Sequence, residues 1–261
     1  MQASVYKKKI SKKLKALLFG KPAKQDYGLF WQKLLAAHRS EWAQARQAAK
    51  EGPRILMATS TGGQAMAAPV ESLLAVALTL RGANVRILLC DQALPICSMA
   101  LSTHFSDPSI LMNDEQTLPR CVKCTRKGNA VFQPLGLPLD FYSQFIDARD
   151  MRDADETADS VPVERIADYC WNDLAVGEHA MAGALRFFAV GELDDDPYAQ
   201  TVLRRFFKAA LLATFTTHQL LRAHSFECAT FHHGIYVPQG LLGEVARQAR
   251  VKVVNWIQAY R

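Results

Sequence analysis

The segment from Arg54 to Cys97 constrains the fold more than any other part of the chain. It begins with a short apolar run, Arg54 to Thr59, which is followed by a Gly62-Gly63 turn and a leucine-rich stretch of helical period. Arg81-Gly82 interrupts that stretch, and a second β-branched run, Val85 to Cys90, comes next. This order is typical of a strand, helix, strand unit. It predicts an α/β fold with a parallel sheet flanked by helices.

The end of the chain repeats the same pattern. An apolar run from Phe226 to Phe231 predicts a strand, Leu241 to Arg250 a helix, and Val251 to Trp256 a final strand. The segment from Pro162 to about His224 has mainly helical periodicity, and Val131 to Leu139 is a candidate short strand. Residues 26–53 predict a leading helix before the first strand, and residues 91–130 a Cys-bearing insertion.

The formal charge of +6 is unevenly distributed. Residues 1–25 hold eight of the 31 basic side chains and none of the 25 acidic ones, so the rest of the chain is slightly acidic. An acidic body argues against nucleic-acid binding. Within the arm, Ile10, Leu14 and Leu17 have helical spacing, and lysines fill the other side. Two readings remain open for residues 7–24: an amphipathic helix on an anionic membrane, or a solvated tail.

The lengths of the apolar segments predict the cellular location of the protein. No stretch reaches the roughly 18 apolar residues of a membrane span, and the apolar part of the basic arm is too short for a secretory signal. We therefore expect a cytoplasmic protein, and the membrane reading of the arm would place it at the periphery of the inner membrane.

The loop after the first predicted strand is a candidate binding site. In a βαβ unit this loop lies at the carboxyl edge of the sheet, where free N–H groups of the next helix can meet a ligand. Its spacing is neither the dinucleotide fingerprint nor the phosphate loop. We predict substrate contacts from Thr59, Ser60, Thr61, Gly62, Gly63 and Gln64.

A histidine pair follows the strand that ends at Phe231. His232 and His233 precede Gly234 and Tyr236, and the loop should lie at the same edge as the Gly62-Gly63 turn. An imidazole with a pKa near 6.5 suits proton removal from a hydroxyl at neutral pH. We predict that these histidines are catalytic, with His233 as the base, and that Gly234 and Tyr236 contact substrate. The alternative is that the histidines merely cap the loop.

Four cysteines have spacings that suggest a metal site. Cys121 and Cys124 form a Cys-x-x-Cys pair, and Cys90 and Cys97 form a wider pair upstream. A structural zinc ion takes four ligands, usually from two close-spaced pairs. Because the upstream pair is irregular, zinc binding by these four thiols is one reading, and free thiols are the other.

Several of these motifs together resemble a known family. The Gly62-Gly63 loop, the Cys90 to Cys97 stretch, Cys121-x-x-Cys124, the loop from His233 to Gly240 and the terminal residues to Arg261 are similar to bacterial capsule and surface polysaccharide biosynthesis proteins, which are glycosyltransferases of the GT-B type. The resemblance implies a Rossmann-like acceptor-side domain over residues 54–261. It also implies that the second, donor-binding domain is absent from this chain.

The resemblance implies a function for the complete enzyme. A sugar would move from a nucleotide sugar to a saccharide or lipid-linked saccharide acceptor, with His233 as base and with no required cofactor, while this chain alone could be inactive. The rival hypothesis is a non-catalytic module that binds carbohydrate or a partner and contains a Cys/zinc structural element.

Overall fold

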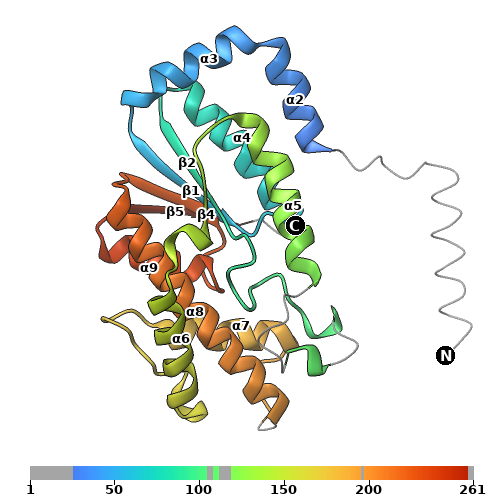
Figure 1. The fold of residues 1–261 in the computed structure, drawn as a ribbon, viewed down its shortest axis with the longest axis vertical. Coiled ribbons are helices and arrows are strands. Elements are labelled where there is room, and N and C mark those ends of the chain that lie inside the picture. Colours follow the sequence, from blue (N-terminus) through green and yellow to red (C-terminus); the bar gives the residue numbers. More distant parts are fainter. Residues whose placement is uncertain (1–25, 105–107, 112–118, 195–196, 258–261) are drawn as a thin grey trace, which may run out of the picture.

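The computed structural model describes residues 26–104, 108–111, 119–194 and 197–257 (Figure 1). The predicted basic arm, residues 1–25, lies outside the described residues, so its contact with a membrane stays a prediction. In the described part, no helix is long and apolar enough to cross a membrane.

The structure alternates strands and helices. The strands are β1 (Arg54–Ser60), β2 (Asn84–Leu89), β3 (Leu139–Phe141), β4 (Cys228–His232) and β5 (Lys252–Trp256). The α-helices are α2 (Tyr27–Ala37), α3 (Arg39–Ala48), α4 (Ala67–Leu80), α5 (Pro119–Phe132), α6 (Ala148–Ser160), α7 (Val176–Phe188), α8 (Pro197–Ala223) and α9 (Gln239–Gln248). Short 3₁₀ turns are η1 (Ala49–Glu51), η2 (Ser102–His104), η3 (Pro108–Leu111), η4 (Gln133–Leu135), η5 (Tyr142–Phe145) and η6 (Val163–Arg165).

The five strands form one parallel sheet in the order β3-β2-β1-β4-β5. The predicted α/β fold, a Rossmann-like parallel sheet flanked by helices, is therefore confirmed. The chain runs outward from β1 to β3 and then returns to place β4 on the other side of β1. In sheets of this kind, ligands bind outside the carboxyl ends of the strands where the order reverses. Here that point lies between the ends of β1 and β4.

The sheet separates two hydrophobic cores because successive side chains of a strand point to opposite faces. From β1, Leu56 and Ala58 enter the core formed with α6, α7, α8 and α9, whereas Met57 enters the core formed with α2, α3, α4 and α5. Figure 1 shows α4 and α5 on one side of the sheet and α8 and α9 on the other. A strand buried on both faces reads as a continuous apolar run, which is why the pattern of β1 could be recognised.

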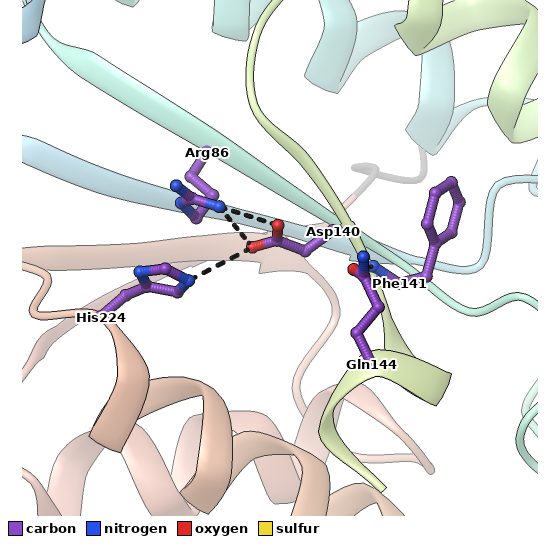
Figure 2. Close-up of polar contacts among 5 residues, drawn as sticks. All are labelled: Arg86, Asp140, Phe141, Gln144 and His224. Carbon is purple, nitrogen blue, oxygen red and sulfur yellow. Dashed lines mark hydrogen bonds and ion pairs between the residues drawn. The ribbon is translucent and has the colours of Figure 1, made fainter.

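The short edge strand β3 is held by a side-chain ion pair. Arg86 of β2 donates from Nη1 to both carboxylate oxygens of Asp140, at 2.7 and 2.9 Å, and His224 Nε2 lies 4.0 Å from Asp140 Oδ2 (Figure 2). Just beyond, Gln144 Oε1 accepts a hydrogen bond from the Phe141 backbone N–H at 2.7 Å (Figure 2). These contacts compensate for a strand of only three residues.

The middle of the chain differs from its sequence prediction. The candidate strand from Val131 to Leu139 is instead the end of α5 followed by η4, and β3 begins only at Leu139. Most of helix α5 lies inside the predicted insertion, 91–130, and the helix is part of the connection between β2 and β3. Its Phe132 is fully buried in the core that contains Trp31 of α2 and Ala75 of α4.

The Gly62-Gly63 turn packs directly against α5. A Cβ added to Gly62 would lie 2.5 Å from the Cα of Gly128, and one added to Gly63 would lie 3.0 Å from Cys124 Sγ. Real Cβ atoms do not approach backbone atoms to 2.5 Å. The glycines thus permit a close approach between the loop after β1 and the crossover helix.

We therefore expect Gly62→Ala to destabilise the protein by about 1–3 kcal/mol, the usual cost of overpacking a close contact. Equilibrium urea unfolding measures this change. Gly191→Ala is the matched control, because a Cβ there meets nothing within 4 Å. Equal unfolding free energies for Gly62→Ala and Gly191→Ala would show that packing against α5 does not require glycine at position 62.

Candidate functional site

Two adjoining cavities open at the carboxyl end of the sheet. We call the first the cysteine cavity; it is lined by Cys90, Cys97, Cys121 and Cys124 together with Ser60, Arg120, Lys123 and Lys127, among others. We call the second the histidine cleft; it is lined by His104, Arg186, His232, His233, Tyr236 and Gln239, among others. Both cavities share Thr61, Gly63 and Met99. The loops after β1 and β4 therefore meet at one site, as the strand order requires.

The histidine pair is held rigidly at the end of β4. His233 has a left-handed backbone with φ of 82°, and its N–H donates to the Trp256 carbonyl at 2.8 Å. Asn255 Nδ2 donates to the His233 carbonyl at 2.6 Å. A side chain with this backbone is strained, and the two hydrogen bonds from β5 compensate for the strain. These hydrogen bonds fix the backbone from which the His233 side chain projects.

Both imidazoles are biased toward the neutral form. Burial lowers the pKa of His232, and the positive charges of His233 and Arg186 lower it further. Burial and the charge of Arg186 likewise lower the pKa of His233. Among the described residues, the buried Nδ1 of His233 has no hydrogen-bond partner. The pair can therefore accept a proton, and His233 Nδ1 is a buried nitrogen whose hydrogen bond is unmade.

Arg186 of α7 supplies positive charge to the same cleft. Its guanidinium carbon lies 5.1 Å from the centre of the Tyr236 ring, and that ring lies 4.7 Å from the ring of His233. Within the described part of the chain, no carboxylate forms an ion pair with Arg186, and its buried Nε has no hydrogen-bond partner. A guanidinium in this setting has its charge and donors available to an anion.

A buried carboxyl group accepts hydrogen bonds that anchor the histidine loop. Glu71 of α4 is fully buried, and its Oε1 accepts hydrogen bonds from the His232 backbone N–H at 2.7 Å and from Trp256 Nε1 at 3.2 Å. Burial raises the pKa of Glu71 to about 7, although these hydrogen bonds oppose the rise. One side chain thus joins α4, the helix that follows β1, to the ends of β4 and β5.

The predicted binding residues of the β1 loop divide into two groups. Thr61, Gly63 and Gln64 line the histidine cleft. Thr59 is buried, and Gly62 packs against α5. The side chain of Gln64 is also a helix cap, since its Oε1 accepts from the N–H groups of Met66 and Ala67 at 2.7 and 2.9 Å.

Ser60 has a different environment from its neighbours. Its backbone is left-handed with φ of 55°, its side chain is fully buried, and its Oγ lies 3.0 Å from the Tyr142 hydroxyl. Burial raises the pKa of Tyr142 far above its ordinary value, so this phenol cannot act as a base for Ser60 at neutral pH. We therefore assign Ser60 a structural contact at the wall of the cysteine cavity.

Of the other predicted residues, Tyr236 lines the histidine cleft and Gly234 has a local structural role. Gly234 has φ of 129°, and a Cβ there would lie 2.3 Å from Asn255 Nδ2. Sequence reasoning missed Arg186, Glu71 and Gln239. Gln239 Nε2 donates to Thr61 Oγ1 at 3.1 Å and to the Thr59 carbonyl at 3.3 Å. Arg186 and Glu71 lie on predicted helical stretches and Gln239 lies at the end of the predicted loop, and nothing local distinguishes any of them from ordinary residues of those segments.

The four predicted metal ligands converge on the cysteine cavity. Cys90 follows β2, Cys97 lies in the next loop, and Cys121 and Cys124 lie near the start of α5. Burial raises the pKa of Cys90 to about 12 and of Cys121 to about 11, and it also raises those of Cys97 and Cys124. Over the described residues, no three His, Cys, Asp or Glu side chains are grouped so that they could hold a single metal ion.

Comparisons with known proteins find only distant structural likeness. No family model matches the chain. No curated protein matches it either. The solved structures that match include a CDPS from Staphylococcus haemolyticus, with 10% identity over 84% of this chain and 96% of that one, at a TM-score of 0.41. A cyclo(L-leucyl-L-phenylalanyl) synthase matches with 12% identity over 84% and 93% of the chains, at 0.37. A cyclodipeptide synthase from Bacillus thermoamylovorans matches with 10% identity over 83% and 92%, also at 0.37.

These findings correct the functional reading of the sequence. The structures found are cyclodipeptide synthases and not glycosyltransferases, so the resemblance to capsule glycosyltransferases was wrong, as were the nucleotide-sugar donor and the saccharide acceptor. The rival reading, a non-catalytic carbohydrate- or partner-binding module, has no support from them either. At these TM-scores, the likeness assigns no activity to this chain.

The physical reason for the error lies in the motifs themselves. The Gly62-Gly63 pair permits the approach of α5, and Gly234 avoids a clash with Asn255. Near the end of the chain, Trp256 donates to the buried Glu71. Residues that resembled glycosyltransferase motifs therefore have packing roles that any chain with this loop geometry would need.

The raised pKa of Glu71 predicts a pH-dependent stability. Because the folded chain keeps this proton to higher pH than the unfolded chain, the folded state loses stability as pH rises from about 4.5 through about 7. Glu71→Gln keeps an oxygen acceptor but removes the titration. We expect wild type to lose up to about 3 kcal/mol relative to this variant between about pH 5 and about pH 8, the equivalent of a shift of roughly two pKa units.

Denaturant unfolding at a series of pH values measures this difference. Glu41→Gln, at an exposed position in α3, is the control for the general effect of removing one carboxylate. Parallel pH profiles for wild type and Glu71→Gln would contradict the assignment.

Proposed function

We propose that this chain binds a small anion-bearing substrate in the histidine cleft and that His233 transfers a proton to or from it. The observation that carries the proposal is Arg186, a guanidinium that lines the cleft beside two histidines and has no carboxylate partner in the described residues. Substrate would bring the missing negative charge, as a phosphate or a carboxylate.

The chemistry of His233 supports the role of a base. Its lowered pKa keeps the ring neutral near pH 7, and Nδ1 has no protein partner among the described residues. A neutral imidazole can remove a proton from a hydroxyl or amine of the substrate. Once protonated, the ring would be stabilised by the substrate anion, which would offset the repulsion from Arg186.

The remaining residues of the cleft would position the substrate. Tyr236 lies between Arg186 and His233 and offers a ring face for stacking. Thr61 and Gln239 are hydrogen-bonded to each other at the wall that joins the loops after β1 and β4. His232 packs on Trp256, with ring centres 4.7 Å apart, and would orient His233 rather than react. Because the elements that carry these groups are packed together, the site would be largely preformed.

Inorganic phosphate is the simplest probe of this proposal. We expect phosphate to raise the pKa values of His232 and His233, because a bound anion favours the protonated rings. Arg186→Gln should weaken phosphate binding by about tenfold or more, the scale of a charge-assisted hydrogen bond. NMR titration of the histidine ring signals measures both quantities.

Arg247→Gln is the matched control, because Arg247 lies on the outer surface and pairs with Glu244 at 2.6 Å. It should leave phosphate affinity unchanged. The proposal fails if phosphate leaves the two ring signals unchanged, or if Arg186→Gln and wild type bind phosphate equally well. A carboxylate probe such as acetate, measured in parallel, identifies which anion the cleft prefers.

A further inference from the structure

The cysteine cavity adjoins the histidine cleft but takes no part in the proton transfer proposed there. Thr61, Gly63 and Met99 line both spaces, so a ligand in the cleft lies beside the cavity. The volume of the cavity is about 140 Å³. An apolar cavity of about 150 Å³ is large enough to bind benzene, so there is room here for a group of roughly six carbon atoms.

The walls of the cavity are largely apolar, although four of the residues are cysteines. Leu94, Met99 and Ala100 contribute hydrocarbon and thioether surface. Burial raises the pKa values of all four cavity cysteines, so their thiols are neutral near pH 7. A neutral buried thiol behaves as a small hydrophobic group. The cavity thus offers an occupant mainly apolar contact.

Two hydroxyl groups at the walls already have partners within the protein. Ser60 Oγ lies 3.0 Å from the Tyr142 hydroxyl. Thr125 Oγ1 donates to the Cys90 carbonyl at 3.4 Å. Because these hydroxyls are hydrogen-bonded before any ligand enters, an apolar group in the cavity would leave neither of them without a partner.

The charges around the cavity favour an anionic ligand. Arg120, Lys123 and Lys127 of α5 line the cavity and are exposed, and no Asp or Glu is among its lining residues over the ranges that the structure describes. A cluster of cations attracts anions to the surface around it. Arg186 provides a further cation in the adjoining cleft. An apolar cavity in this setting fits a ligand that combines an apolar group with an anion.

We propose that the cysteine cavity binds the apolar group of the same substrate whose anion meets Arg186 in the histidine cleft. This inference rests on the function proposed above, and it narrows the substrate to a phosphate monoester or a carboxylate that carries a short alkyl chain or a single ring. The thiols act by contact, and none forms a bond with the substrate.

A series of alkyl phosphates from methyl to butyl tests the inference on the full chain. Each methylene group that leaves water for an apolar site tightens binding by about fourfold. We therefore expect n-butyl phosphate to bind at least about tenfold more tightly than methyl phosphate. NMR titration of the ring signals of His232 and His233 measures these affinities. Pentanoate and acetate make the same comparison for a carboxylate.

Cavity-filling variants locate the apolar group. Ala100→Leu and Cys121→Leu enlarge side chains that line the cavity. They should remove most of the gain for butyl phosphate while methyl phosphate binds as it does to wild type. Cys170→Leu is the matched control at an exposed cysteine outside the cavity, and it should leave the whole series unchanged. The unfolding transition of each variant establishes that it is folded.

Thiol alkylation gives a second readout that needs no substitution. Wild-type protein is treated with iodoacetamide, and mass spectrometry measures the modification of each cysteine. Butyl phosphate at about ten times its dissociation constant should slow the alkylation of Cys121 and Cys124 by about tenfold. The exposed Cys170 should react at an unchanged rate. Toluene carries no anion and should shield the same two cavity thiols, so it tests the cavity independently of the cleft.

Two outcomes would overturn the inference. In the first, butyl phosphate binds no more tightly than methyl phosphate and pentanoate no more tightly than acetate. In the second, neither butyl phosphate nor toluene shields Cys121 and Cys124. A different result separates the two proposals: if phosphate does not bind but toluene shields both thiols, the apolar cavity is supported and only the function proposed for the histidine cleft fails.

Discussion

The close contact between the Gly62-Gly63 turn and α5 determines how the site is assembled. Because neither glycine has a Cβ, the loop after β1 approaches the helix to van der Waals distance at Gly128 and Cys124. This approach brings Cys121 and Cys124 to the same cavity as the two cysteines that follow β2. The same turn also forms part of the wall of the histidine cleft. The absence of a Cβ at Gly62 and Gly63 therefore shapes both the cysteine cavity and the histidine cleft.

The electrostatics of the site depend on burial more than on charge pairing. Burial raises the pKa of Glu71 and lowers those of His232 and His233, so each of these groups is shifted toward its neutral form. Arg186 keeps its charge, because a guanidinium does not lose its proton in a protein. The cleft thus combines neutral proton carriers with one fixed cation. This combination suits an anionic substrate better than a neutral one.

The sequence predicted the two ends of the fold and the helical character of Pro162 to His224 well, and the connection between β2 and β3 poorly. Strands β1, β2, β4 and β5 and the helices α4 and α9 correspond to the predicted βαβ units, because strands and helices buried in an α/β fold have strong apolar patterns. The stretch from Val131 to Leu139 was predicted as extended but continues α5 through Phe132 into η4. Tertiary contacts decide its structure, since Phe132 and Leu135 are fully buried beneath α2 and α3.

The sequence by itself determined the fold class and the edge of the sheet at which the candidate site lies, because apolar periodicity and glycine turns are local signals. It could also name the histidines and cysteines, whose chemistry is visible in their residue types. Only the tertiary structure could show that Arg186 joins the histidines and that four cysteines share one cavity. Such groupings depend on how segments far apart in the chain pack together, and a single sequence has no local pattern that records this. The same limit explains why glycines required for packing could be mistaken for glycosyltransferase motifs.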